Sequence, residues 1–451
     1  MWKPLVAVVF ASVLGAPQPA LAMAGSCASR DFAAQAKATV EAFAPVFSGA
    51  VLVAVDGKPV LRQAVGPANR EWNIANTPET KFRLGSITKQ FTAAAILQLA
   101  EQGKLTIDDP VSRYYPAAPP SWSKITIKQL LTHTSGIPDY PELAGFDGHE
   151  ERFAHTPEQL IQSVRDKPLQ FEPGAQFAYD NTGYVLLGYI VEKLSGQSYA
   201  QYLQTHVFGP LGMRNTGYDV GEKILTERAA GYALGSEGWV NAAPVDMSTP
   251  FSAGGLYSTV EDLLIWDRAL YAGKPLSAAS QAAMFTDYGH RYGFGWWVRT
   301  QWGHDIIWHG GGINGFSNAF QRYPKDRLTV VVLSNSQASP SAKLATDLAG
   351  LCLGVPVYPK EVSLPASLLD RYVGFYEAKP DFIVHVERKG DRLQTQATGQ
   401  MVVPIYAKDA TAFYAKLTGA EFVFQTDTAG QITGLVRRQG GREQSLKRIS
   451  R

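Results

Sequence analysis

The chain has 451 residues, more than one hydrophobic core usually organises, so we expect two domains. Its hydrophobic content of 45% and aromatic content of 11% are those of a folded globular protein. Lysine and arginine total 42 against 40 aspartate and glutamate, without a long run of either sign. This balance argues against a nucleic-acid partner, which needs a concentrated basic face.

Residues 1–24 have the pattern of a secretory signal peptide. Lys3 supplies a positive end, residues 5–16 are apolar, and small residues around Ala22 and Ala24 provide a cleavage site. The alternative is an uncleaved anchor, but the apolar stretch is well short of the roughly 20 residues that span a bilayer. We therefore expect a periplasmic or secreted protein with no stable membrane anchor after cleavage.

The next part of the chain combines a helix, a hairpin and a second helix. Hydrophobic periodicity predicts the first helix over residues 29–47. Residues 49–55 and 59–65 have the pattern of two strands joined at Asp56-Gly57, a strong hairpin signal. An apolar stretch over residues 90–100 predicts a second helix, buried all round, that stops at Gly103.

A serine and a lysine stand three residues apart at the start of the second helix, in Ser86-Ile87-Thr88-Lys89. This spacing puts a hydroxyl and an amine on one helical face, where the amine can take the hydroxyl's proton. The same pattern recurs at Ser121-Trp122-Ser123-Lys124, in a Pro-rich loop without a helix. Ser86 could instead be only an N-cap, but a lysine in the first turn opposes the helix dipole, so that alternative leaves Lys89 unexplained.

From about residue 103 to residue 249 the pattern changes to helices and long loops rich in proline and glycine, including a helix over residues 182–194. Tyr179-Asp180-Asn181 leads directly into that helix. Asn181 could be only an N-cap and Tyr179 only a packed aromatic residue. In the functional interpretation, the Tyr179 phenol passes a proton to the leaving group, and the Asn181 amide holds Lys89 or a substrate carbonyl.

Strand patterns return in the last part of the first domain and are followed by a helix. The predicted strands cover residues 292–299, 305–309, 316–323 and 328–334, and the helix covers 341–353. The simplest assembly is a sheet with strands from both ends of the domain and a helical region inserted between them.

His309-Gly310-Gly311-Gly312 ends one of these strands. Three glycines weaken a strand unless something approaches its backbone closely. A flexible turn is one interpretation. The sharper one is an edge strand that lines the site, where the Gly312 and Ser86 amides together bind an oxyanion.

The only two cysteines, Cys27 and Cys352, flank nearly the whole first domain. Export would place them where disulfides persist, and a bridge is feasible if the first and last helices lie side by side. Two buried free thiols are the alternative. His304 and His309 form the one close histidine pair in a strand region, without a third ligand at metal-site spacing, so we expect no metal and no organic cofactor.

Residues 354–365 carry three prolines and no periodicity, which indicates a linker. Residues 371–451 then alternate apolar and polar positions through eight short segments, which predicts a small antiparallel barrel in a domain of residues 366–451. Large aromatic residues of this region, Phe375, Tyr406 and Phe422, are expected in its core rather than around a ligand. The predicted strands cover residues 372–376, 382–387, 393–397, 402–407, 412–417, 421–425, 432–437 and 444–449.

Three motifs resemble, in this order, those of the serine beta-lactamase and penicillin-binding-protein superfamily. They are Ser86-Ile87-Thr88-Lys89, Tyr179-Asp180-Asn181 and His309-Gly310-Gly311. The resemblance covers about residues 30–350 and is closest to the class C-like branch of esterases, D-aminopeptidases and D,D-peptidases. The segments 82–86, 130–136 and 253–256 support it. It implies an α+β fold, with an antiparallel sheet flanked by helices and an all-helical region. The C-terminal barrel resembles the lipocalin-like appendage of some of these hydrolases.

The resemblance also implies roles for individual residues. Ser86 is the acylated nucleophile, Lys89 the proton acceptor and Tyr179 the partner base and acid. The substrate-binding positions would be Asn181, as the positioning group, His309, in the place of the third motif's usual lysine, and Gly312, as an oxyanion donor.

Two departures from the family pattern bear on the substrate. Asp180 stands where serine or alanine is common, and it would keep Lys89 protonated if it pointed inward, so we expect it to face away. His309 in place of lysine removes a fixed positive charge that would grip a substrate carboxylate, which puts efficient beta-lactam hydrolysis in doubt. Substrates without that carboxylate become more plausible.

These observations predict an exported serine hydrolase that cleaves a small-molecule or peptide ester or amide through a Ser86 acyl-enzyme. We rank D-amino-acid peptides and esters above general carboxylic esters, and both above beta-lactams. A non-catalytic protein that binds cell-wall peptides or a lipid on the same fold is the alternative. The residues leave the oligomeric state open.

Overall fold

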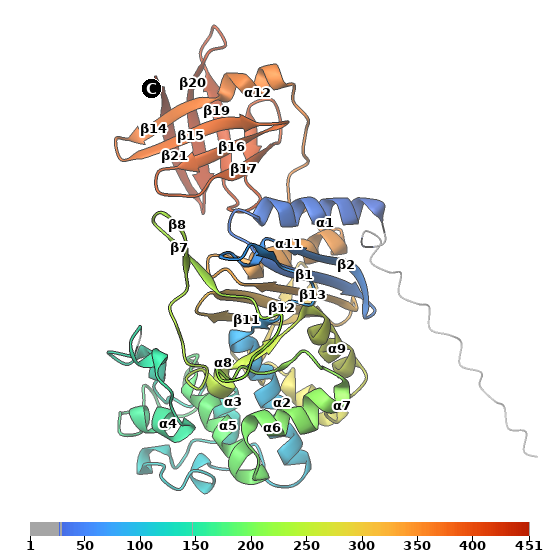
Figure 1. Ribbon diagram of the computed structural model, residues 1–451, viewed down its shortest axis with the longest axis vertical. Helices are drawn as coiled ribbons and strands as arrows, with labels where there is room; N and C mark the ends of the chain where they lie inside the picture. The colour runs from blue at the N-terminus through green and yellow to red at the C-terminus, as the bar shows by residue number, and fades with distance from the viewer. Residues whose placement is uncertain (1–26, 28, 147, 451) are drawn as a thin grey trace, which may run out of the picture.

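The computed structural model describes residues 27, 29–146 and 148–450. It contains a larger domain built on one antiparallel sheet and a separate C-terminal barrel (Figure 1). The α+β fold class predicted from the sequence is confirmed. The predicted signal peptide, residues 1–24, lies outside the described residues. Within the described part of the chain, every helix is too short or too polar to cross a bilayer.

The central sheet takes strands from both ends of the larger domain, as the pattern predicted. Its six strands follow the order β10-β11-β12-β13-β1-β2, and all neighbours are antiparallel. The first hairpin turns at Asp56 and Gly57, which both have positive φ angles, as a two-residue type I′ turn requires. The strands are β1 (Gly49–Val55), β2 (Lys58–Val65), β10 (Trp297–Gln301), β11 (His304–Ile313), β12 (Phe316–Tyr323) and β13 (Leu328–Ser334).

Both faces of the sheet are covered, which explains why β1 is apolar at every position. Side chains alternate between the two faces of a strand. Ala50 and Leu52 belong to the hydrophobic core on the side of the helical region, whereas Val51 and Val53 belong to the core on the opposite side. A strand with this double burial cannot show the alternation of polar residues that marks a half-exposed strand.

Two helices cover one face and join the ends of the larger domain. They are α1 (Arg30–Phe43) and α11 (Ser341–Leu353), whose buried side chains share one core. Cys27, just before α1, forms a disulfide with Cys352 in the last turn of α11, with 4.4 Å between the Cα atoms. Of the two alternatives left open by the sequence, the structure has the bridge.

The other face carries the helical region. Its centre is α2 (Lys89–Glu101), buried over almost its whole length, which packs against α5 (Thr182–Ser195). The other helices are α3 (Ile127–Leu131), α4 (Pro157–Arg165), α6 (Tyr199–Leu203), α7 (Gly209–Leu211), α8 (Phe251–Gly254), α9 (Val260–Tyr271) and α10 (Ala278–Met284). Short strands complete this domain: β3 (Pro67–Asn69), β4 (Ile74–Ala75), β5 (Phe82–Arg83), β6 (Gly217–Tyr218), β7 (Tyr232–Gly235), β8 (Gly238–Asn241) and β9 (Leu256–Ser258).

In the larger domain, two predicted strands differ clearly from the structure. The strand expected over residues 292–299 begins only at Trp297, because Gly293 and Gly295 let the preceding segment bend closely against the end of α10 and the start of α2. A Cβ on Gly295 would lie 2.7 Å from the Lys89 carbonyl oxygen, so this turn accepts only glycine. The strand expected over residues 305–309 is longer, since β11 continues through the glycine run to Ile313.

The C-terminal region forms a closed barrel of eight antiparallel strands, as predicted. Residues 354–365 form neither helix nor strand. Helix α12 (Ala366–Tyr372) precedes the barrel, although the sequence pattern had placed Tyr372 in the first strand. The strands are β14 (Gly374–Lys379), β15 (Phe382–Lys389), β16 (Arg392–Ala397), β17 (Val403–Ala407), β18 (Ala412–Tyr414), β19 (Glu421–Thr426), β20 (Ile432–Gln439) and β21 (Arg442–Ile449).

The three aromatic residues expected in the barrel core have different surroundings. Phe422 is buried in the barrel core, as predicted. Tyr406 is also buried, but it packs with the core shared by α1 and α11 and so joins the barrel to the larger domain. The prediction for Phe375 is wrong, because this half-buried ring stacks on His385, with 4.5 Å between the ring centroids, while its neighbour Tyr376 occupies the core.

Candidate active site

Ser86 lies on a tight turn that leads into α2, and Lys89 is the first residue of α2. The turn is a 3-10 helix, Gly85–Thr88, rather than the first turn of the α-helix expected from the sequence. Residues three apart eclipse one another in a 3-10 helix, and here the Lys89 Nζ lies 3.2 Å from the Ser86 Oγ. Gly85 has a φ of +57°, and a Cβ at this position would lie 2.7 Å from the Gly312 carbonyl oxygen. Glycine at position 85 therefore allows the Ser86 turn to touch β11.

Lys89 is fully buried and has three oxygen partners. Besides Ser86, its Nζ donates to the Asn181 Oδ1 at 2.8 Å and to the Ala253 carbonyl oxygen at 3.0 Å. Burial lowers the pKa of Lys89 to about 7, against opposing contributions from Asp139 and Asp180. A neutral lysine keeps two N–H donors for Asn181 and Ala253 and turns its lone pair to the Ser86 hydroxyl.

Asp139 holds the Asn181 amide in the orientation that Lys89 requires. The Asp139 carboxylate accepts from the Asn181 backbone N–H at 2.7 Å and from the Asn181 side-chain Nδ2 at 2.9 Å. With its amide nitrogen engaged, Asn181 can present only its oxygen to Lys89. Burial raises the pKa of Asp139 to about 6, further raised by Asp180 and opposed by the bonds from Asn181. Sequence reasoning missed Asp139, although it lies three residues after the 130–136 segment.

Replacement of Asp139 by asparagine is expected to lower kcat by about 10- to 100-fold, because one Asn181 donor loses its acceptor and the amide is no longer fixed. Asp139 also raises the pKa of Lys89, so its removal lowers that pKa and shifts the acidic limb of the pH–rate profile to lower pH. Steady-state kinetics from pH 5 to pH 9 measure both effects.

Asp109→Asn is the matched control, because Asp109 also accepts a backbone N–H, from Thr106 at 2.7 Å, but in a loop away from Ser86. A slower Asp139→Asn enzyme with an unshifted acidic limb would contradict the link to Lys89 and leave Asp139 a purely structural role.

Tyr179 lies beside Ser86 and Lys89. The Lys89 Nζ is 4.7 Å from the centroid of its ring. Burial raises the pKa of the Tyr179 phenol, and hydrogen bonding with Ser86 opposes that rise. The phenol is therefore protonated at neutral pH and is available as a proton donor.

The Asp180 side chain makes no ion pair with Lys89 among the described residues, in line with the expected orientation. Its Oδ1 accepts from the Gly183 N–H at the start of α5, and its Oδ2 lies 3.7 Å from the His133 Nδ1. That contact is not an ion pair either, because the His133 Nδ1 accepts from the Asp180 backbone N–H at 3.1 Å and the ring is neutral. Burial, with Lys89 nearby, lowers the pKa of His133, and burial raises the pKa of Asp180 to about 7.

The glycine run of β11 forms a local edge beside Ser86. β11 is the second strand of the sheet rather than its edge, but β10 pairs with it only as far as Trp308, so beyond that residue β11 has no paired strand on this side among the described residues. Gly311 is required by packing, since a Cβ there would lie 1.9 Å from the Leu84 carbonyl oxygen. Gly312 has open space on its Cβ side and lines the same cavity as Ser86.

His309 lies behind this edge. Only 3% of its surface is exposed, and it does not line the Ser86 cavity. Its Nδ1 donates to the Gly310 carbonyl oxygen at 2.6 Å, so its Nε2 accepts from the Tyr292 hydroxyl at 3.0 Å. Burial lowers the pKa of His309 to about 3, and the ring is neutral. In this structure both ring nitrogens are occupied, so direct substrate contact by His309 stays a prediction that the geometry does not favour.

A cavity of about 210 Å³ opens over Ser86. Asn181 and Gly312 line it with Ser86, and the rings of Tyr140 and Phe146 form an apolar wall. Among the described residues that line it, Glu151 is the one with a charged side chain. The Glu151 Oε1 accepts from the Asn314 Nδ2 at 3.1 Å, which holds the carboxylate at the cavity. Sequence reasoning missed Glu151, because nothing in its local pattern marks it.

Metal ligands do not gather at this site. In the part of the chain that the structure describes, no three histidine, cysteine, aspartate or glutamate side chains form a group that could hold a metal ion.

Comparison with known proteins agrees with this geometry. Residues 36–352 match the family model described as Beta-lactamase, and residues 358–448 match a domain of unknown function, DUF3471. Penicillin-binding protein 4* of Bacillus subtilis is 29% identical, over 89% of this chain and 95% of its own. A D-aminopeptidase of Gluconobacter oxydans is 29% identical, over 76% of this chain and 67% of its own. The structure of a D-stereospecific amidohydrolase from Streptomyces superposes with a TM-score of 0.60 at 27% identity, covering 69% of this chain and 97% of that one.

Proposed function

The chain belongs to the beta-lactamase family of serine hydrolases, and we propose that it is an exported amidohydrolase or esterase that forms an acyl-enzyme on Ser86. One observation carries the proposal. The Lys89 Nζ lies 3.2 Å from the Ser86 Oγ, in a buried site that lowers the pKa of the amine to about 7. An amine with this pKa is half neutral at pH 7 and can accept the serine proton.

The proposed reaction has two halves. Lys89 takes the Ser86 proton while the Oγ attacks the substrate carbonyl carbon, and the Ser86 and Gly312 amides hold the oxyanion. The proton then passes from Lys89 through the Tyr179 phenol to the leaving amine or alkoxide, and the acyl-enzyme forms. Water attacks this ester in the second half, with the same two groups taking and returning its proton, and the acid is released.

The substrate proposed is an aminoacyl amide or ester with a free amino group. Support comes from the charge of the Ser86 cavity, which has the Glu151 carboxylate and, among its described lining residues, no lysine or arginine. A carboxylate favours an ammonium group at close range. The D-aminopeptidase and D-stereospecific amidohydrolase relatives favour the D configuration. Beta-lactams rank lower, because their carboxylate would meet Glu151 without a compensating cation.

The test compares D-phenylalanine amide with its N-acetyl derivative, in the wild type and in Glu151→Gln. The wild type should prefer the free amine, and Glu151→Gln should raise KM for the amine by about tenfold while leaving KM for the N-acetyl substrate unchanged, since one charge-assisted bond contributes about 1.5 kcal/mol or more.

Glu150→Gln is the matched control, because Glu150 is the next carboxylate along the chain but does not line the Ser86 cavity. Equal turnover of both substrates by the wild type, or equal effects of the two variants, would refute the role of Glu151 and leave the hydrolase proposal standing.

Export is supported by the signal pattern of residues 1–24 and by the Cys27–Cys352 disulfide, a bond that persists in oxidising compartments. Expression of the full chain in a Gram-negative host, followed by fractionation and N-terminal sequencing, should find a periplasmic protein that starts near residue 23 or 25. A cytoplasmic protein with an intact N-terminus would refute export.

A further inference from the structure

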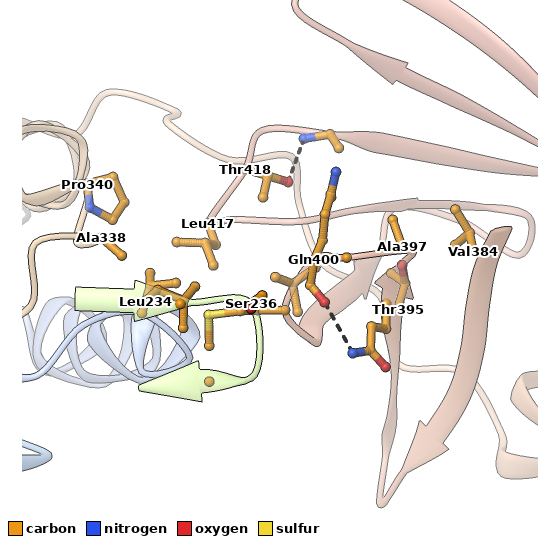
Figure 2. A pocket seen from close by; sticks show the side chains of 18 of the residues that line it. Leu234, Ser236, Ala338, Pro340, Val384, Thr395, Ala397, Gln400, Leu417 and Thr418 are labelled. Carbon is orange, nitrogen blue, oxygen red and sulfur yellow. Dashed lines mark hydrogen bonds between the residues drawn. The ribbon is translucent and has the colours of Figure 1, made fainter. Parts of the chain in front are cut away.

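A second cavity, of about 810 Å³, lies between the barrel and the larger domain (Figure 2). The β7–β8 hairpin forms one wall together with Ala338 and Pro340, and β15, β16 and the segments around Met401 and Leu417 form the barrel wall. This cavity and the Ser86 cavity have no lining residue in common. Its volume falls within the range of small-molecule sites, about 300–1,000 Å³, and barrel mouths are a recurrent place for such sites.

The two ends of the barrel are built differently. Helix α12 covers the end away from the larger domain (Figure 1), and its Tyr372 ring packs 4.4 Å from the Phe424 ring in the barrel core. At the other end, Val384, Ala397 and Phe422 face the cavity rather than a covering helix. The barrel is therefore filled at one end and hollow at the end that faces the β7–β8 hairpin.

Arg437 brings a positive charge into the hollow end. It pairs in register with Phe422 of the neighbouring strand, so both side chains point to the inner face of the barrel. Its guanidinium donates to the neutral Gln439 amide oxygen and lies 5.9 Å from the centroid of the Phe382 ring, and no ion pair reaches it among the described residues. Burial lowers the pKa of Arg437 without an acidic group that opposes the effect, and an arginine in this setting stays charged.

The wall opposite Arg437 offers an apolar contact. Leu234, on β7, keeps 39% of its surface exposed and lines the cavity across from the barrel residues, as Figure 2 shows. Glu237, at the exposed turn of the hairpin, is the acidic residue of the lining. A half-buried cation with no ion-pair partner among the described residues, in a chamber that also offers apolar side chains, fits a molecule with one anionic group and a hydrocarbon part.

We propose that the hollow end of the barrel is a binding site for an amphipathic carboxylate. The carboxylate pairs with Arg437, and the hydrocarbon part lies between Met401 and Val403 of the barrel and Leu234 of the hairpin, which all line the cavity and are not fully buried. The ligand bridges the two domains, so its binding also fixes the barrel against the larger domain.

Titration calorimetry on the full chain at pH 8, with decanoate and 1-decanol as probes, tests the site. Decanoate should bind one-to-one, and 1-decanol, which has the same chain length without the charge, at least tenfold more weakly. Arg437→Gln should weaken decanoate binding at least tenfold. Arg438→Gln is the matched control, because the exposed Arg438 is paired with Glu443 at 2.8 Å outside the cavity, and it should change the affinity less than twofold.

Leu234→Asn, on the exposed hairpin, gives a second variant if Arg437→Gln lowers the melting temperature, and it should weaken decanoate binding at least threefold. The proposal is overturned if the wild type does not bind decanoate, if 1-decanol binds as tightly, or if the Arg437 and Arg438 variants behave alike.

Discussion

Ser86→Ala is expected to lower kcat/KM for an amide or ester substrate by at least about 10⁴-fold and to abolish labelling by a fluorophosphonate. The hydroxyl oxygen is the atom that the proposed mechanism acylates. In triad hydrolases, loss of the nucleophile removes almost all catalysis and leaves only a small rate enhancement due to the oxyanion site and substrate binding. Mass spectrometry of the labelled wild type should place the phosphonyl group on the peptide that contains Ser86.

The second S-x-x-K pattern of the chain supplies a matched control. Ser121 and Lys124 are exposed and lie at the short 3-10 helix Pro120–Trp122, outside the residues that line the Ser86 cavity. Ser121→Ala should therefore be labelled and be active like the wild type. Equal labelling of Ser86→Ala and wild type would refute an acyl-enzyme on Ser86, and absence of labelling in both would favour the non-catalytic alternative.

The contrast between these two patterns marks how far sequence reasoning reaches. A serine and a lysine at this spacing meet only where the backbone turns sharply and the lysine is buried, and the apolar stretch after Lys89 predicted that burial correctly. The 3-10 geometry of the turn was not predictable, because it depends on the contact between Gly85 and Gly312, which lie far apart in the sequence.

The first and last residues of helices and strands were predicted well where the local sequence pattern and the tertiary packing favour the same element. Strands β12 and β13 and helix α11 have the residues expected, since the apolar residues of each follow the period of its own element and each ends at a turn or a glycine. The segment before β10 failed for the opposite reason. Its aromatic residues have high strand propensity, but Tyr292 serves as the hydrogen-bond donor to His309, and the two glycines bend the chain against α10 and α2.

Residues that position another side chain, or that reach the site from an irregular segment, were the hardest to identify from the sequence. Asp139 contacts Asn181, and its importance appears only when the hydrogen bonds are traced from Lys89 outward. Glu151 reaches the Ser86 cavity from a single 3-10 turn, Glu150–Arg152, which is too short to show a periodic pattern in the sequence. Conversely, His309 was assigned to the substrate from its place in the motif, whereas the structure turns its ring into the protein.

Lys89→Met is expected to lower kcat/KM by about 10³-fold, within the range of general base catalysis, and to change the shape of the pH–rate profile. The pKa of Lys89 is lowered from 10.5 to about 7, and the reactive form is the neutral amine. Wild-type kcat/KM should therefore rise with pH and reach half of its plateau near pH 7. The variant has no amine to deprotonate, so its residual activity should lack that limb.

Lys81→Met separates this effect from the loss of any buried lysine. Lys81 is nearly as buried, but its Nζ binds the Thr226 carbonyl oxygen and Glu227, both at 3.1 Å, and not the Ser86 hydroxyl. This control should keep the wild-type profile, with its limb near pH 7. If Lys89→Met retained that limb, the titrating base would be another group. Asp180, whose pKa is raised to about 7 by burial, would then be the first residue to substitute. Tyr179 would not account for such a limb, because burial moves the pKa of its phenol upward, away from neutrality.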